Sequence, residues 1–116
     1  MLSHIAILME NQPGALSRVV GLFSQRGYNI DSLSVAPTQD PTLSRLTMTT
    51  SENPEIVNQI LRQLYKLVDV VMVQNLSDAE AYSIELAIIK LVSSTEKIEK
   101  IISQAKELEG KILDDK

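Results

Sequence analysis

The chain has 116 residues, a formal net charge of −4 and a pI of about 4.9. Hydrophobic residues make up 44%, which is enough for a packed core and argues against disorder. The acidic balance and an aromatic content of only 3% argue against binding to nucleic acid or to an anionic membrane. Without cysteine there are no disulfides or thiolate zinc sites. With no signal peptide and no apolar run of about 18 residues, the sequence predicts a cytoplasmic protein.

The first predicted elements are a strand, a turn and a helix. Residues 5–9 form a continuous apolar run that is typical of a central strand. Asn11-Gln12-Pro13-Gly14 breaks this run. The next apolar residues follow the i, i+3, i+4, i+7 spacing of one helix face, namely Leu16, Val19, Val20 and Phe23. Gly27 is expected to end this helix in a left-handed conformation.

The following elements complete one fold pattern. Residues 30–36 and 43–50 are predicted strands, separated by a loop at 37–41. Asn53 and Pro54 are expected to begin a second helix, whose apolar face is Val57, Ile60, Leu61 and Leu64. Residues 68–73 are a predicted fourth strand. The order βαββαβ predicts an α+β ferredoxin-like fold, in which an antiparallel sheet carries two helices.

The basic residues change type near residue 76, since all four arginines precede it and only lysines follow. We therefore expect a first domain at residues 1–76, a polar linker at 77–81 and a second segment at 82–116. The second segment predicts a strand at 82–92, a helix that begins at Ser94 or Thr95 and ends at Gly110, and a strand at 112–113. It corresponds to a truncated βαβ half of a second ferredoxin-like domain. Because such a half buries little, we expect it to pack on another chain or on the first domain, or to be poorly ordered.

Consecutive segments carry a resemblance to a known family. Residues 7–23, ILMENQPGALSRVVGLF, resemble the opening of an ACT domain. Residues 24–38, SQRGYNIDSLSVAPT, resemble more specifically the small regulatory subunit of acetolactate synthase (acetohydroxyacid synthase), which acts in valine, leucine and isoleucine synthesis. DPTLSR at 40–45 and QLYKLVDV at 63–70 extend the match to about residue 75. The part from residue 82 is shorter than the family's usual second domain, so we expect a shortened chain.

The resemblance implies a non-catalytic regulatory subunit. Such a subunit binds valine or another branched-chain amino acid, and it activates and feedback-regulates a catalytic large subunit. The family's large subunit carries thiamine diphosphate, Mg²⁺ and FAD, so no cofactor, metal site or catalytic residue is expected in this chain. ACT domains pair by joining their sheets side by side, which implies a homodimer.

The effector-binding site is expected at the turn of residues 11–14. Unpaired backbone N–H groups from about Gly14 to Leu16, at a helix N-terminus, suit a carboxylate, and the side-chain carbonyl of Asn11 suits an ammonium group. From the residues alone, an ordinary strand–helix turn is the favoured interpretation. The resemblance reverses this preference, because the same loop binds the effector in the family. The residues implied on this side are Asn11, Gln12, Pro13, Gly14, Ala15 and Leu16.

The second half of the site is expected at Asn29 and Ile30. The resemblance implies that these residues of one protomer face the effector loop of the other, with Ala36 further along the same strand as a weaker influence. The alternative is that Asn29 serves only in the turn after Gly27, a role that Asn tolerates well. An apolar pocket distinguishes one methylene by about 1–3 kcal/mol, so we expect valine to be preferred over leucine and isoleucine.

Two other functions are possible on this fold, and the residues argue against both. An acylphosphatase on the same fold needs an arginine in a glycine-rich loop after the first strand, and residues 11–14 have no arginine and one glycine. A free-standing sensor for transcription would need a helix-turn-helix or a basic face, and neither is visible. His4 is expected to be solvated, and Glu10 is expected to be structural rather than a general base.

Overall fold

The computed structural model describes residues 2–78 and 81–114. The chain divides into two compact units, Met1–Ser83 and Ile84–Lys116. The elements of the first unit are β1 (Ser3–Glu10), α1 (Ala15–Arg26), β2 (Ser32–Pro37), β3 (Leu43–Thr50), α2 (Pro54–Leu64), β4 (Val70–Asn75) and the short 3₁₀ helix η1 (Leu76–Asp78). The predicted ferredoxin-like order is therefore confirmed. The expected linker at 77–81 falls partly in η1, and its residues 79–80 lie outside the described residues.

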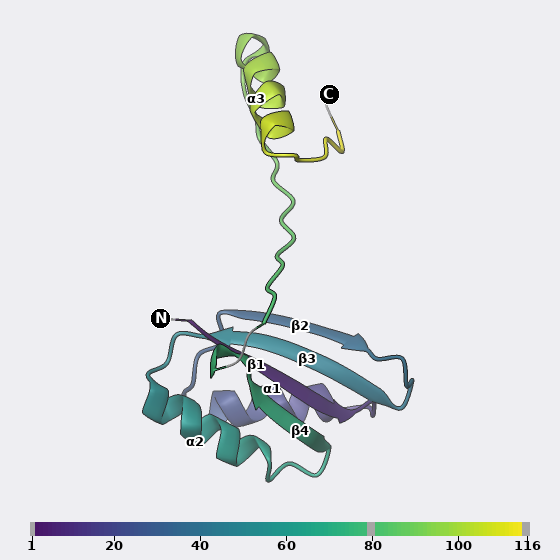
Figure 1. Cartoon of the computed structure of the whole chain (residues 1–116), viewed down its shortest axis with the longest axis vertical. Helices are drawn as coiled ribbons and strands as arrows, with labels where there is room; N and C mark the ends of the chain where they lie inside the picture. The colour runs from purple at the N-terminus through teal and green to yellow at the C-terminus, as the bar shows by residue number, and fades with distance from the viewer. Residues whose placement is uncertain (1, 79–80, 115–116) are drawn as a thin grey trace. The chain divides into compact units, whose positions relative to one another are not determined.

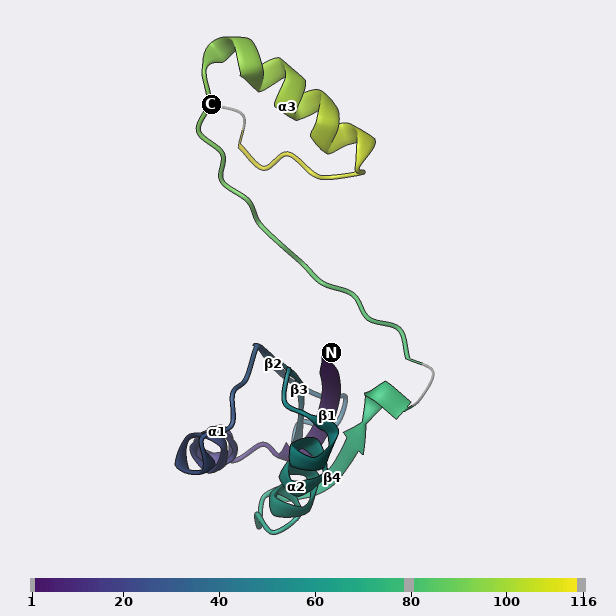
Figure 2. The same ribbon diagram turned by 90° about the vertical axis from the view of Figure 1, so that its left-hand side faces the viewer.

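The four strands form one antiparallel sheet in the order β2-β3-β1-β4. The central strand β1 pairs Ile7 with Leu46 of β3 on one side and with Val73 of β4 on the other. Because side chains alternate along a strand, these three residues share one face of the sheet. Figures 1 and 2 show α1 and α2 on the same face, which leaves the opposite face uncovered within this unit.

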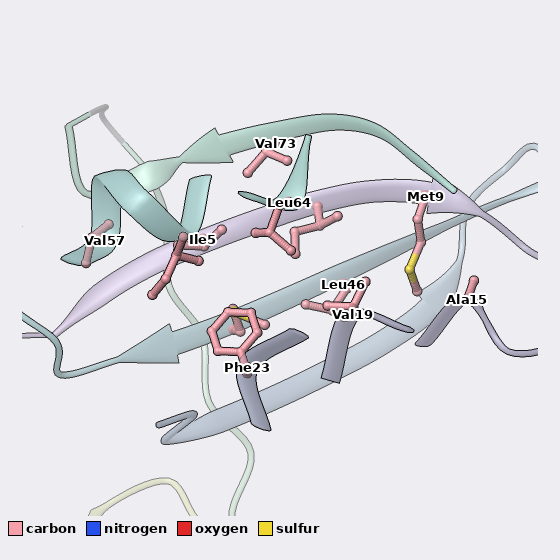
Figure 3. Close-up of a cluster of buried hydrophobic side chains, with 12 residues drawn as sticks. Ile5, Met9, Ala15, Val19, Phe23, Leu46, Val57, Leu64 and Val73 are labelled. Carbon is pink, nitrogen blue, oxygen red and sulfur yellow. The ribbon is translucent and has the colours of Figure 1, made fainter. Parts of the chain in front are cut away.

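The core lies between this sheet face and the two helices (Figure 3). Both helices contribute a row of buried side chains at i, i+3 or i+4 spacing, namely Ala15, Val19 and Phe23 from α1 and Val57, Ile60 and Leu64 from α2. The predicted face of α1 is rotated, because Ala15 is buried whereas Leu16 is 39% exposed. Phe23 meets the ring of Tyr28 edge-on at 6.0 Å between centroids, a favoured aromatic geometry.

The helix ends follow the sequence signals. Gly27 adopts φ 71° after α1, and its N–H reaches the carbonyls at the helix end. Asn53 caps α2, where its side chain accepts the N–H of Ile56 at 3.0 Å, and Pro54 occupies the first turn. Within the described ranges, no helix is both long and apolar enough to cross a lipid bilayer.

The second unit contains the predicted helix, α3 (Thr95–Glu107), but not the predicted strands. Residues 81–94 and 108–114 are not assigned to strands, so the expected strands at 82–92 and 112–113 are wrong for this structure. The sheet order explains the difference. In the first unit, β3 lies between β1 and β2, so a lone βαβ half has no neighbour for either strand to pair with. Ile84 and Leu86 are accordingly 92% exposed. The expected packing of this segment on another chain or on the first domain stays a prediction.

Candidate functional site

The turn predicted to bind the effector, residues 11–14 and called the effector turn below, joins β1 to α1 and is tied to the loop between β2 and β3. The backbone N–H of Asn11 donates to the carbonyl of Thr42 at 2.7 Å, and Asn11 Nδ2 donates to the carbonyl of Pro41 at 3.0 Å. The amide nitrogen of Asn11 is therefore engaged. Among the described residues, no donor reaches Asn11 Oδ1, the oxygen assigned to an ammonium group.

Gly14 is the N-cap of α1 and has φ 85°, in the left-handed region that favours glycine. A Cβ at this position would lie 3.0 Å from Arg18 Nη1. Glycine thus meets two requirements here, the backbone conformation of the turn and the close approach of the Arg18 guanidinium. Gln12 and Pro13 complete an exposed turn, in which Gln12 N–H donates to the carbonyl of Glu10 at 2.9 Å.

The first turn of α1 presents free backbone N–H groups, as the sequence predicts, but not at every predicted position. Ala15 is buried and its N–H donates to the carbonyl of Gln12 at 3.1 Å, so neither its side chain nor its N–H is available to a ligand. The N–H of Arg18 is also used, by the carbonyl of Gly14. Within the described chain, this leaves the N–H groups of Gly14, Leu16 and Ser17 without a hydrogen-bond partner. Ser17 was not predicted.

An ion pair behind the effector turn was also missed. Arg18 Nε donates to a carboxylate oxygen of Asp69, whose side chain is buried. The hydrogen bond with Arg18 lowers the pKa of Asp69, and the same bond raises the pKa of Arg18. The carbonyl of Asp69 accepts the N–H of Glu10 at 2.8 Å, so Asp69 holds both sides of the turn. No local pattern signals a partner 51 positions away.

A hollow of about 430 Å³ lies beside these groups. It extends from Gly14 along α1 to Gln25 and is bordered by Leu22 and Leu67. Asn29 and Ile30 do not line it. The predicted site takes Asn29 and Ile30 from the other copy, so their absence from this lining does not bear on it.

The second predicted half, Asn29 and Ile30, precedes β2. Asn29 is exposed, and its Nδ2 donates to Asp31 Oδ1 at 2.9 Å. The carbonyl of Asn29 accepts the hydroxyl of Thr50 at 2.8 Å, which fixes this segment beside the end of β3. Ile30 is half-buried and packs against the hydrophobic core.

The two predicted halves lie at opposite ends of β3. Thr42, which holds Asn11, directly precedes β3, whereas Thr50, which holds Asn29, is its last residue. Eight residues of extended chain span roughly 26 Å. The structure therefore does not bring Asn29 to the effector turn of the same chain.

The strand that connects the two ends, β2, is an open edge of the sheet. All six of its residues are exposed, including the apolar Leu33 and Val35 and the predicted Ala36, which lies opposite Arg45. Thr38 N–H donates to the carbonyl of Leu43 just beyond the strand, so by alternation the backbone groups of Leu33 and Val35 point away from β3. Those outward groups are available to another strand.

Comparison with known proteins places these features in context. Residues 5–72 match the model of the AHAS small subunit-like ACT domain. The acetolactate synthase isozyme 3 small subunit of Salmonella typhimurium is 46% identical over 110 residues, which cover 95% of this chain and 68% of that protein. The acetolactate synthase small subunit of Haemophilus influenzae is 47% identical over 110 residues, with the same two coverages.

Solved structures give the same result. The crystal structure of the acetolactate synthase small subunit from Thermotoga maritima aligns with a TM-score of 0.77 and 29% identity, over 98% of this chain and 71% of that one. The ACT domain of the GTP pyrophosphokinase from Chlorobium tepidum aligns with a TM-score of 0.57 and 22% identity, over 71% of this chain and 92% of that one. The second likeness concerns the fold alone.

Proposed function

Since the chain belongs to the family of acetolactate synthase small subunits, we propose that it binds a branched-chain amino acid, valine in the first place, at a site shared by two copies. This is the family that residues 7–38 resemble. The small subunits are regulatory, and the ACT domain here spans residues 5–72.

One observation supports a binding site shared by two copies: the two predicted halves of the site lie at opposite ends of an open edge strand. Antiparallel pairing of two β2 strands about a twofold axis places the Ser32 end of one copy beside the Pro37 end of the other. Asn29 and Ile30 precede the first end, and the loop that holds Asn11 follows the second. Pairing of two copies thus brings together groups that a single chain keeps apart, and it does so twice per dimer.

The groups that meet suit a free amino acid. The N–H groups of Leu16 and Ser17, at the positive end of α1, suit the carboxylate. Asn11 Oδ1 suits the ammonium group. Leu16 is 39% exposed and, with Ile30 of the partner copy, offers apolar surface to an aliphatic side chain. Such a surface separates valine from leucine or isoleucine by only about 1–3 kcal/mol, so the larger amino acids are weaker effectors rather than excluded ones.

Regulation would follow from the shared location of the site. A ligand that touches both copies binds the paired state better than the unpaired one, which is the differential affinity that allostery requires. The responding partner is the catalytic large subunit of acetolactate synthase, to which we assign thiamine diphosphate, Mg²⁺ and FAD. The expected response is activation by this chain and feedback inhibition by valine.

A complementation experiment tests the shared site. Asn11→Ala and Asn29→Ala each remove one half, so isothermal calorimetry of either variant should show no valine binding. Mixed dimers contain one intact site, and random exchange restores about one quarter of the sites in an equimolar mixture. Asn58→Ala, an exposed position in α2, is the matched control and should bind valine like the parent. If the mixture of the two variants still shows no valine binding while the control variant binds valine, a site shared between copies is refuted.

The regulatory role is tested separately. An acetolactate synthase catalytic subunit is assayed alone, with this chain, and with this chain plus valine. We expect activation by the chain and its reversal by valine. Activity that changes in neither condition would refute the regulatory role.

A further inference from the structure

The sheet has a second edge strand, β4 (Figure 1). Its free side differs from that of β2. Tyr65, the residue that caps the C-terminal end of α2, lies against it. The Tyr65 hydroxyl donates to the carbonyl of Val73 at 2.9 Å and accepts the N–H of Val73 at 3.2 Å. One hydroxyl therefore satisfies both outward backbone groups in the middle of the strand.

The strand also departs from regular β geometry on either side of Val73. On one side, the pairing of β1 with β4 shifts register between Leu8–Met72 and Met9–Val70, so Val71 is the extra residue of a β-bulge. On the other side, Asn75 Oδ1 accepts the N–H of Ser77 at 3.0 Å, and the chain turns into η1. A regular ladder along this side would thus have to begin at Val73, the residue that Tyr65 covers.

We propose that Tyr65 closes the β4 edge to strand addition, so that sheet-to-sheet assembly of this chain uses the β2 edge alone. An exposed edge with unpaired N–H and C=O groups is a template for another strand. A copy with two open edges joins a neighbour at each, and such contacts need not close. If each copy has only one open edge, assembly through strand pairing ends at two copies. The limit at two copies rests on the β2 pairing proposed above, whereas the closure of the β4 edge does not.

The strand that would add to an unguarded β4 edge is β4 of a second copy. Val71 and Met72 on this strand are 51% and 54% exposed, so a twofold contact between two β4 strands would bury apolar surface. Together with pairing at β2, this contact links pairs into open-ended strings.

The test replaces Tyr65 by phenylalanine, which keeps the ring and removes the hydroxyl. Sedimentation of the full chain is followed over a concentration series. We expect the parent to reach a limit at a pair and Tyr65→Phe to form larger species as concentration rises. Tyr28→Phe is the matched control, because the Tyr28 hydroxyl donates to Gln59 Oε1 in α2, at 3.4 Å, and makes no other hydrogen bond among the described residues. The double variant Tyr65→Phe, Val71→Lys places a charge on the opened edge and should return to the parent's distribution.

Hydrogen exchange of the Val73 amide supplies a second readout. In dilute Tyr65→Phe, this amide should exchange roughly five- to tenfold faster than in the parent, the effect of losing one hydrogen bond. At high concentration it should become protected again. Sedimentation like that of Tyr28→Phe, or unchanged exchange at Val73, would overturn the proposal. If the parent is a monomer, the β2 pairing fails, and Tyr65→Phe must then gain one association step or the closure of β4 fails as well.

Discussion

Three single glycine-to-alanine substitutions in the α1 region distinguish the effect of backbone conformation in the effector turn from an effect on ligand binding. Gly14 and Gly27 both have positive φ, at 85° and 71°, whereas Gly21 lies within α1 with nothing within 4 Å of an added Cβ. Gly14 and Gly27 stand at opposite ends of the same helix. Only Gly14 belongs to the proposed ligand site, so Gly27 is a control for backbone strain and Gly21 for the added methyl group.

The expected magnitudes follow from backbone conformation. A left-handed conformation costs an L-residue about 1–2 kcal/mol, so Gly14→Ala and Gly27→Ala should each lose about this much unfolding free energy. The contact of a new Cβ at position 14 with Arg18 Nη1, at 3.0 Å, adds little, because the end of a long side chain can move. Gly21→Ala should instead gain about 0.5–1 kcal/mol, since glycine is unfavourable inside a helix.

Urea denaturation measures the three stabilities, and calorimetry measures valine affinity for each variant. We expect Gly14→Ala and Gly27→Ala to be destabilised alike, with valine binding weakened only by Gly14→Ala. Gly14→Asp, which adds a carboxylate beside the ligand's own, should abolish binding while the fold persists, since Asp tolerates positive φ better than alanine. Unchanged valine affinity in Gly14→Asp, or equal losses of affinity in Gly14→Ala and Gly27→Ala, would refute the assignment of this turn.

Two further predictions concern stability. Because Arg18 lowers the pKa of Asp69 in the folded chain, the pair stabilises the fold above the usual aspartate pKa of about 3.9, and this contribution is lost as pH falls through the lower folded pKa. Asp69→Asn should thus be less stable than the parent at pH 7 in urea denaturation, with the gap narrowing below about pH 4; a gap independent of pH would contradict this. Asn53→Ala removes the cap of α2 and should cost about 0.5–2 kcal/mol in the same assay. Asn58→Ala in the exposed face of α2 should cost nothing, and equal losses would exclude a capping effect.

Local patterns predicted the first unit well, and their errors have local causes. The strand at 43–50 was predicted with its observed bounds, because its side chains alternate between the core and the open face. The fourth strand was placed two residues early. Val68 extends the apolar run, but it is 86% exposed in the turn before β4. Periodicity identifies an apolar residue without showing whether the chain around it has reached the sheet.

The turn of the candidate site follows from local residues, whereas the contacts around it depend on distant residues. Pro13 and Gly14 predict the turn from their own backbone preferences, since proline fixes φ and glycine permits a positive φ. The burial of Ala15, by contrast, depends on how α1 is rotated against the sheet, and the partner of Arg18 lies 51 positions away. The strands expected in the second unit failed for a related reason, since a strand forms only where another strand pairs with it.

The position of β1 has a consequence during synthesis. This strand is translated first among the four, yet it lies in the interior of the sheet, where it pairs with residues 43–50 and 70–75. Translation at about 5–20 residues per second leaves it without its last partner for several seconds. Until β3 emerges, this eight-residue strand with Ile5, Ile7 and Met9 has both sides unpaired, and until β4 emerges one side stays unpaired. The nascent chain is thus most exposed to misassembly and to chaperone capture before β4 leaves the ribosome.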